Sequence, residues 1–247
     1  MKPKLMQESL REPPRPPHPS MELTDRQAAI ASIYWEKAWE VAAPLYPGPA
    51  ESLLAGDEEL RAELLFCLLG GHGISYELNL SAADRLWERG LFRTARRLPK
   101  RSIQAELRKA QFEPRRSNGD LRRYRFPVRK AELLFAAQLW LEGIGSLAAE
   151  ISAISCEFKR RDFLCSCPGI GPKSASWLLR NCGYARELAV LDIHVVRAMQ
   201  ACGRIDKADL VRDYEIVETE YLSWCRDYEA DPARFDLIVW DFSRSRG

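Results

Sequence analysis

Apolar positions recur every three or four residues along most of the chain, which is the spacing of one face of an α-helix. No long alternation of β-branched residues, as expected of a strand, interrupts this pattern. The sequence therefore predicts an all-α protein. The first predicted helix is capped by Thr24 or Asp25 and ends near Ala43. The others span 57–69, 81–90, 101–111, 128–142, 146–154, 157–166, 172–182, 192–202, 207–229 and 232–242.

Two segments depart from this pattern. Residues 1–22 are rich in proline and charge, which predicts a disordered or extended tail, with a proline-recognition ligand as the alternative. The segment Pro114 to Gly119 reads as a loop. The tail lacks the apolar stretch of a secretory signal, and no apolar run approaches the length of a membrane span. We therefore expect a cytoplasmic protein without a membrane anchor.

The composition is that of an ordinary globular protein. The chain has 247 residues, of which 46% are hydrophobic, enough for one large core or two smaller ones. Its seven cysteines are odd in number and contain no Cys-x-x-Cys pair, which favours reduced thiols over a disulfide framework. A zinc site among the cysteines at 156, 165, 167 and 182 is a weaker alternative, because no ligand spacing supports it.

Charge is distributed unevenly, although the net value is only +2. Residues 93–130 contain fourteen Lys and Arg against three acidic residues, and residues 206–241 contain eleven acidic residues against four basic ones. A basic stretch with aromatic residues is typical of a surface that follows a phosphate backbone. The alternative is a solvated face that pairs with the acidic C-terminal part of the chain.

One motif carries chemistry. The sequence Cys-Pro-Gly-Ile-Gly-Pro-Lys at 167–173 joins two predicted helices, and Asp192 follows Lys173 by nineteen positions. Glycines at 169 and 171 let the backbone approach a nucleic-acid strand, and Pro172 suits a first helical position. The amide groups that begin the second helix would face a phosphate. Lys173 is thus predicted to lie on the first helical turn, beside the strand.

These residues resemble the helix-hairpin-helix DNA glycosylase superfamily. The nearest likeness is to archaeal-type 8-oxoguanine DNA glycosylase/lyases, through Gly169 to Tyr184 and Asp192 to Arg197. Weaker likeness occurs at 63–69, 129–132 and 235–240. The resemblance implies a two-lobed helical fold with a DNA-binding cleft between the lobes. It also implies an N/C-terminal lobe of 23–68 plus 205–247, and a helical barrel of 69–204 containing the hairpin 157–182.

The resemblance assigns the reaction to two residues. Lys173 would attack C1′ of the sugar and form a Schiff base that permits strand cleavage by β-elimination. Asp192 would cap its helix and either activate the nucleophile or stabilise the sugar cation. Lys173 as a simple phosphate contact, and Asp192 as a simple cap, are the alternatives.

Further site residues follow from the same resemblance. A flipped base needs flat or apolar walls, for which Trp177, Trp240 and Phe242 are candidates, although the last two also fit an apolar helix face. The predicted DNA contacts are Gly169, Gly171, His72, Arg125, Lys130, His194 and Arg197. His72 stands in the loop that fills the gap left by the flipped base in related enzymes.

The expected substrate is double-stranded DNA containing 8-oxoguanine, bound by a monomer. Another modified base, including a bulky hypermodified cytosine of phage DNA removed in antiviral defence, is the alternative. Other classes left open are a non-catalytic DNA-binding hairpin module and a helical interaction protein. The mechanism requires no metal or organic cofactor, apart from a monovalent cation that such a hairpin can hold.

Overall fold

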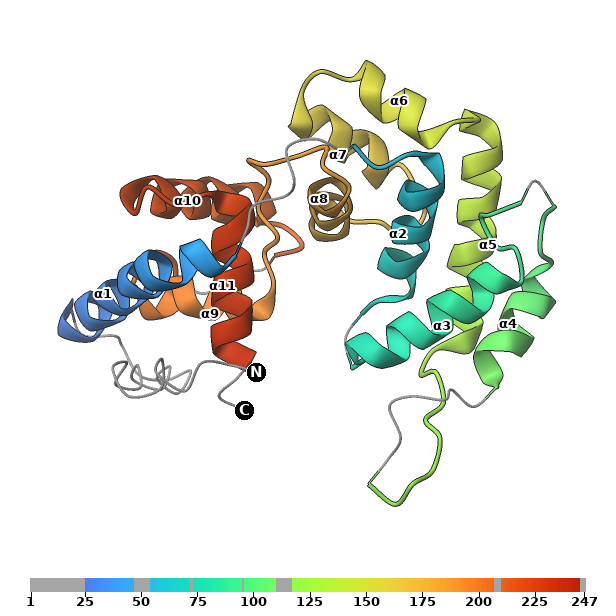
Figure 1. Ribbon diagram of the computed structural model, residues 1–247, viewed down its shortest axis with the longest axis horizontal. Helices are drawn as coiled ribbons and strands as arrows, with labels where there is room; N and C mark the ends of the chain where they lie inside the picture. The colour runs from blue at the N-terminus through green and yellow to red at the C-terminus, as the bar shows by residue number, and fades with distance from the viewer. Residues whose placement is uncertain are drawn as a thin grey trace. The chain divides into compact units, whose positions relative to one another are not determined.

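The computed structural model describes residues 25–46, 54–71, 73–94, 96–109, 117–206 and 210–244. Within these residues it contains eleven α-helices, one short 3-10 helix and no extended strand, as predicted (Figure 1). The chain divides into two compact units. Unit 1 comprises residues 1–48 and 189–247, and unit 2 comprises residues 49–188.

Unit 2 is built around a leucine-rich helix. Its helices are α2 (Asp57–Leu69), α3 (Tyr76–Glu88), α4 (Lys100–Arg108), α5 (Pro127–Ile144), α6 (Leu147–Ala153), α7 (Glu157–Cys165) and α8 (Pro172–Asn181). Leu60, Leu64 and Leu68 form a fully buried stripe on α2. Because α2 packs against α3, α5, α6 and α8, this stripe forms the centre of the unit 2 core.

Unit 1 has an aromatic core. Its helices are α1 (Asp25–Ala42), α9 (Ile193–Ala201), α10 (Tyr214–Asp227) and α11 (Pro232–Arg244), with the 3-10 turn η2 (Ala43–Leu45) after α1. Trp224 of α10 meets Phe235 of α11 edge to face, with ring centroids 4.8 Å apart. Such pairs stabilise beyond the area they bury, so this contact joins the two helices that follow α9.

Most helices begin and end within a few residues of their predicted bounds, with two differences. Helix α3 begins at Tyr76, five residues before the predicted start, because the hydroxyl of Ser75 accepts a hydrogen bond from the backbone N–H of Leu78. Helix α10 begins at Tyr214, whereas the prediction started it at 207. A turn covers residues 210–213, and residues 207–209 lie outside the described part of the chain.

The unit boundaries also differ from the predicted lobes. Helix α2 was expected in the N/C-terminal lobe, but its leucines belong to the core of unit 2. Residues 189–204 were expected in the barrel lobe, but Leu191 and Val195 belong to the core of unit 1. In both cases the packing partner decides the assignment, and a single sequence does not name that partner. The tail of residues 1–22 lies outside the described residues.

None of the seven cysteines forms a disulfide. Cys167, Cys182, Cys202 and Cys225 are buried, and burial raises the pKa of each thiol to about 12. These four thiols therefore act as small core groups. Among the described residues, no three His, Cys, Asp or Glu side chains gather as a metal site would require. Nor does any described helix have the length and apolarity to cross a bilayer.

Candidate active site

The turn between α7 and α8 is closed by backbone hydrogen bonds. The N–H of Cys167 donates to Leu164 over 3.0 Å, and the N–H of Ile170 donates to the carbonyl of Cys167 over 3.1 Å. Gly169 has φ +92°, and a Cβ there would lie 3.1 to 3.3 Å from Leu68 and Leu133. The turn thus needs glycine at 169 both for its backbone conformation and for its packing on α2 and α5.

Gly171 has a different role. Its backbone is extended, with φ −110° and ψ 176°, and a Cβ would meet no atom within 4 Å. Pro172 opens α8 with the ring that a first helical position tolerates, and Ala175 N–H donates to Gly171 at 3.0 Å. The first amides of α8 have no intrahelical acceptor, so this exposed end of the helix favours an anion. The open space at Gly171 and the start of α8 at Pro172 are compatible with the predicted phosphate contact, which stays a prediction.

Lys173 lies on the first turn of α8, as predicted, and its side chain is exposed. It makes no hydrogen bond or ion pair with any other described residue. Burial raises the pKa of the Cys67 thiol, and the charge of Lys173 acts in the opposite direction. Cys67 Sγ in turn donates to the carbonyl of Ser174 at 3.7 Å. Lys173 is therefore an unpaired cation at the positive end of a helix, with α2 beside it.

Trp177 lies one turn after Lys173 and is held by α2. Its indole N–H donates to Glu63 Oε1 over 2.9 Å, and the side-chain amide of Asn181 donates to the same oxygen over 2.8 Å. The Arg180 guanidinium carbon lies 5.5 Å from the centroid of the Trp177 ring. The ring predicted to line the base pocket is thus half-buried and fixed at its edge by a carboxylate.

Asp192 caps α9 in unit 1. Its Oδ1 accepts hydrogen bonds from the backbone N–H groups of His194 at 2.8 Å and Val195 at 2.9 Å. The predicted cap is therefore confirmed. Its Oδ2 has no hydrogen-bond partner among the described residues and remains able to meet a cation. Because Lys173 belongs to unit 2 and Asp192 to unit 1, the meeting of the two stays a prediction.

The segment before Asp192 is fixed by α10. The buried carboxylate of Glu218 accepts from the backbone N–H of Ala189 at 3.0 Å, and the hydroxyl of Tyr214 donates to the carbonyl of Ala189 at 2.8 Å. Both backbone groups of one residue are thus satisfied by side chains of a single helix. Ala189 lies three residues before Asp192, so α10 positions the carboxylate through the backbone.

The other predicted residues of unit 1 lie on α9 and α11. On α9, His194 is half-buried and Arg197 is exposed. On α11, Trp240 is half-buried, and Phe242 is half-buried and packs against the aromatic core of unit 1. Phe242 thus fits the alternative in which it belongs to the apolar face of its helix. The predicted substrate contacts of these four residues stay predictions.

Two of the predicted DNA contacts, Arg125 and Lys130, lie at the loop after α2. His72 lies outside the described residues. Arg125 is exposed, and its guanidinium occupies the place that a Cβ at Gly73 would take. Lys130 is half-buried, and its amine donates to the carbonyls of Leu68 at 2.5 Å and Gly70 at 2.6 Å. Lys130 thus caps the end of α2, and a direct DNA contact by it stays a prediction.

Acidic residues of unit 2 neutralise part of the basic stretch. Ion pairs join Arg93 to Glu58, Arg97 to Glu142, Lys100 to Glu132, and Lys109 to Glu106. By contrast, Arg123, Arg125 and Arg129 are exposed and make no ion pair with the described residues. They surround the first turn of α5, which contains no acidic side chain. Cations at the positive end of a helix are unfavourable without an external anion.

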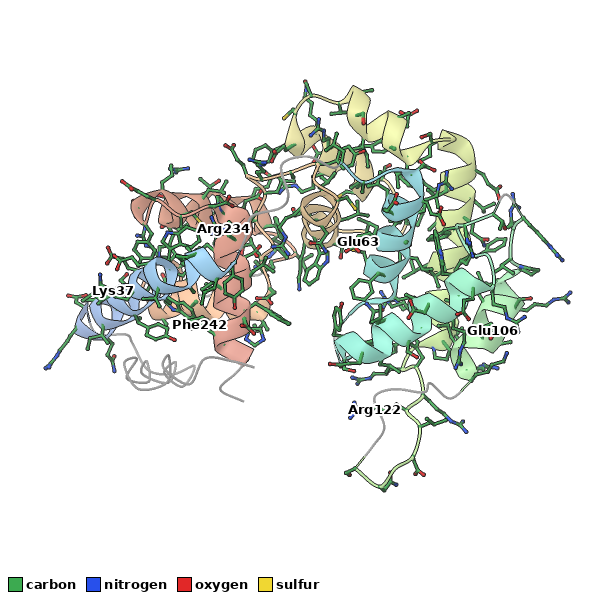
Figure 2. All side chains as sticks on the ribbon, in the orientation of Figure 1. Lys37, Glu63, Glu106, Arg122, Arg234 and Phe242 are labelled. Carbon is green, nitrogen blue, oxygen red and sulfur yellow. The ribbon has the colours of Figure 1, made fainter. Side chains whose placement is uncertain are left out.

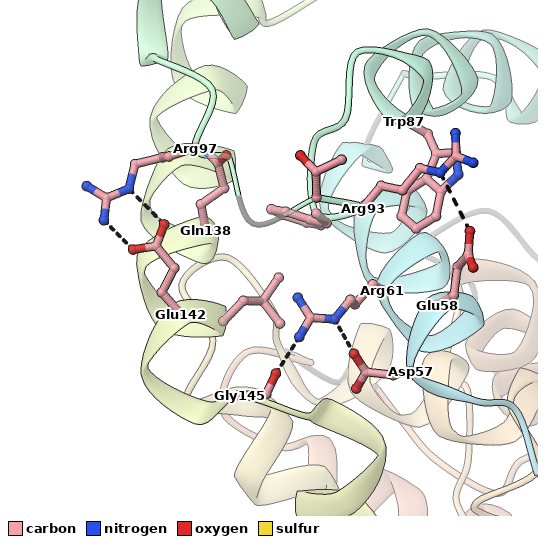
Figure 3. Close-up of a pocket in the computed structure, with 12 residues that line it drawn as sticks. Asp57, Glu58, Arg61, Trp87, Arg93, Arg97, Gln138, Glu142 and Gly145 are labelled. Atoms are coloured by element: carbon pink, nitrogen blue, oxygen red, sulfur yellow. Dashed lines mark hydrogen bonds and ion pairs between the residues drawn. The ribbon is translucent and has the colours of Figure 1, made fainter.

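A cavity of about 660 Å³ in unit 2 is a separate feature (Figure 3). It lies between the start of α2, the end of α5, the turn at 91–94 and Arg97. None of the predicted site residues lines it. Its charged groups are matched with one another, since Arg61 pairs with Asp57, Arg93 with Glu58, and Arg97 with Glu142. The cavity therefore has no uncompensated charge to attract DNA.

The sequence did not indicate three residues that hold the candidate site residues in place: Glu63 in unit 2, and Tyr214 and Glu218 in unit 1. Glu63 directly precedes the apolar run 64–69 of α2, and Glu218 is buried on α10. An acidic residue on the apolar face of a helix is costly to bury without a partner, and this was the signal available in the sequence. The partners themselves come from α8 and from the segment before α9, and only the tertiary structure reveals them.

Known proteins are similar to this chain in sequence and in fold. The family model for 8-oxoguanine DNA glycosylase matches residues 51–229. The 8-oxoguanine DNA glycosylase/AP lyase of Thermotoga petrophila is 29% identical over 210 residues, covering 83% of this chain and 92% of that protein. The crystal structure of the 8-oxoguanine DNA glycosylase of Thermotoga maritima is 27% identical, with a TM-score of 0.63 over 86% of this chain and 95% of that one.

A second solved structure shows the fold at lower identity. It is that of the Methanocaldococcus jannaschii 8-oxoguanine glycosylase/lyase in complex with a 15mer DNA containing 8-oxoguanine. It is 21% identical and gives a TM-score of 0.60, covering 77% of this chain and 83% of that one. The all-helical architecture predicted from the sequence is confirmed by these likenesses.

Proposed function

Because the chain belongs to the 8-oxoguanine DNA glycosylase family, we propose that it flips 8-oxoguanine out of double-stranded DNA, excises it, and cleaves the strand through a Schiff base. Lys173 is the nucleophile and Asp192 the anion that faces the sugar. The observation that carries this proposal is the unpaired, exposed ammonium of Lys173 on the first turn of α8, directly after the hairpin turn.

The proposed reaction has two stages. The neutral amine of Lys173 forms a bond to C1′ while the C1′–N9 bond breaks, and the base leaves with the electron pair and gains a proton. The second amine proton then moves to the ring oxygen O4′ as the C1′–O4′ bond breaks, and the opened sugar is left joined to Lys173 by an imine. Abstraction of a C2′ proton then expels the 3′ phosphate. Asp192 Oδ2 stabilises the positive charge that develops on the sugar in the first stage.

DNA binding is supported by two features of unit 2. The open space at Gly171 and the free amides of α8 suit a phosphate. The exposed cations Arg123, Arg125 and Arg129 supply a second phosphate-binding surface around α5. A monovalent cation held between the hairpin carbonyls and a phosphate is part of the same proposal. We propose that the enzyme acts as a monomer in the cytoplasm.

Borohydride trapping tests the proposal. The protein is incubated with duplexes containing 8-oxoguanine, undamaged guanine, or a bulky modified cytosine, and a reductant fixes any imine as a covalent adduct. We expect an adduct with the 8-oxoguanine duplex and none with Lys173→Gln. Base removal without trapping, revealed only after alkali, would exclude the Schiff-base step. Salt-dependent binding without base removal would instead support the non-catalytic hairpin module.

Excision of a bulky hypermodified cytosine, as in phage DNA, is the alternative within the same enzyme class. Preferential release of that base over 8-oxoguanine in the same duplex set would replace the proposed substrate and support a role in antiviral defence. The catalytic assignment of Lys173 would be unaffected, since both bases leave from the same sugar carbon.

A further inference from the structure

Glu63 joins two helices at the site with a single oxygen atom. Its Oε1 accepts from Trp177 at 2.9 Å and from Asn181 at 2.8 Å, and these two donors lie one turn apart on α8. Figure 2 labels Glu63 where α2 faces α8. A carbonyl-type oxygen has two lone pairs, so this atom is saturated by the two donors. The bonds therefore set both the spacing of α2 from α8 and the direction of the indole.

The Trp177 ring is also restrained on its face. The Arg180 guanidinium carbon lies 5.5 Å from the ring centroid, within the range of a cation–π contact. Burial raises the pKa of Glu63, while the bonds from Asn181 and Trp177 and the charge of Arg180 act in the opposite direction. A carboxylate kept partly out of water in this way is costly, and it serves here to hold an aromatic ring.

The restrained ring lies beside the proposed nucleophile. Trp177 and Lys173 are four residues apart on α8, so they are neighbours on one face of the helix. Long side chains on a helix lean toward its N-terminus, which directs the indole over the turn that carries Lys173. If Lys173 receives the sugar as proposed, the flipped base lies near this ring.

We propose that Glu63 is a specificity-determining positioning residue, which fixes Trp177 as a rigid wall of the base pocket and thereby selects the base presented to Lys173. This inference rests on the proposed glycosylase function and adds to it a residue that does not itself touch the reacting atoms. The wall acts on the base and not on the sugar. Its loss should therefore impair removal of a base more than cleavage at a site that has already lost its base.

Two variants separate the hydrogen bonds from the charge. Glu63→Gln keeps a carbonyl oxygen able to accept both bonds, whereas Glu63→Met has similar length and no acceptor. Each is given a duplex with 8-oxoguanine and a duplex with a preformed abasic site, under single-turnover conditions. For Glu63→Met we expect base release to slow about 10- to 100-fold, as for a misplaced substrate, with cleavage of the abasic duplex changed less than about threefold. Glu63→Gln should release the base within about threefold of the native rate.

Matched variants test whether the effect passes through the ring. Trp177→Phe keeps an aromatic ring but removes its N–H, and the double variant with Glu63→Met should be no slower than the worse single one. Glu59→Met, on an exposed turn of the same helix, should leave both reactions at the native rate. Thermal unfolding of all variants checks the fold.

Several results would overturn the inference. One is a Glu63→Met variant that releases the base at the native rate. Another is a double variant whose loss of rate is the product of the two single losses. A third is a Glu63→Gln variant that releases the base as slowly as Glu63→Met. Parallel loss of both reactions would also do so, because it would indicate damage to α8 as a whole. Failure of the proposed function itself looks different, since the native protein would then neither release a base nor be trapped on the abasic duplex.

Discussion

Glu218 and Ala189 are joined by a hydrogen bond of 3.0 Å between a buried carboxylate and a backbone N–H. The bond connects α10 to the segment that leads to Asp192. A buried N–H that loses its acceptor carries the full cost of its desolvation. The position of the proposed catalytic carboxylate therefore depends on a residue far from it in sequence.

Replacing Glu218 should therefore lower stability and activity together. We expect Glu218→Leu to reduce the free energy of unfolding by about 1–3 kcal/mol, because the Ala189 N–H is left unpaired. Tyr214→Phe removes the bond to the Ala189 carbonyl, with an expected cost of about 0.5–1.5 kcal/mol. Urea unfolding measures both values. Native stability of Glu218→Leu would show that the Ala189 N–H finds another acceptor.

Different substitutions should separate the two roles of Asp192, the helix cap and the proposed catalytic anion. Asn is as good a cap as Asp, so we expect Asp192→Asn to keep stability within about 0.5 kcal/mol. Asp192→Ala should cost about 0.5–2 kcal/mol, because the N–H groups of His194 and Val195 lose their acceptor. Both variants should slow base release about 100-fold or more, since neither retains the anion. Full activity of Asp192→Asn would limit this residue to capping.

The two hairpin glycines should respond differently to the same substitution. Gly169→Ala places a Cβ at positive φ against Leu68 and Leu133, with an expected cost of about 1–3 kcal/mol. Gly171→Ala meets open space at an ordinary φ, so its melting temperature should stay near the native value. Its affinity for duplex DNA should nevertheless fall, because the added methyl group stands where a phosphate approaches. Fluorescence anisotropy at fixed salt measures this affinity, and an unchanged value would place the phosphate elsewhere.

Lys130 should give the stability a distinct pH dependence. Burial and the nearby Arg129 lower the pKa of Lys130 from 10.5 to about 8. Above pH 8 the unfolded chain therefore holds the proton more tightly than the folded one, so this residue should make stability rise with pH between about 8 and 10. After allowance for solvent screening, the rise is about 0.5–1 kcal/mol. The free energy of urea unfolding is measured for the native protein and for Lys130→Gln at pH 8, 9 and 10, and the difference between the two isolates this rise. An equal pH slope in the variant would contradict the assignment.

The sequence predicted the local features of the site and left the long-range ones open. The hairpin, the first-turn position of Lys173 and the cap formed by Asp192 depend on residues close together in the chain, where glycine, proline and aspartate have definite local preferences. The bonds from Glu63 to α8 and from Glu218 to Ala189 join residues far apart in sequence. The bonds from Lys130 to the carbonyls of Leu68 and Gly70 show the same limit, because the sequence does not indicate that this lysine caps α2.

The buried sulfur atoms bear on the conditions in which such an enzyme would work. A thiol must ionise before it reacts readily with peroxide, and the groups at 167, 182, 202 and 225 stay protonated at neutral pH because each has a pKa near 12. Oxidised guanine accumulates when a cell is exposed to oxidants such as peroxide. These four buried thiols should therefore resist oxidation under the conditions that create the proposed substrate.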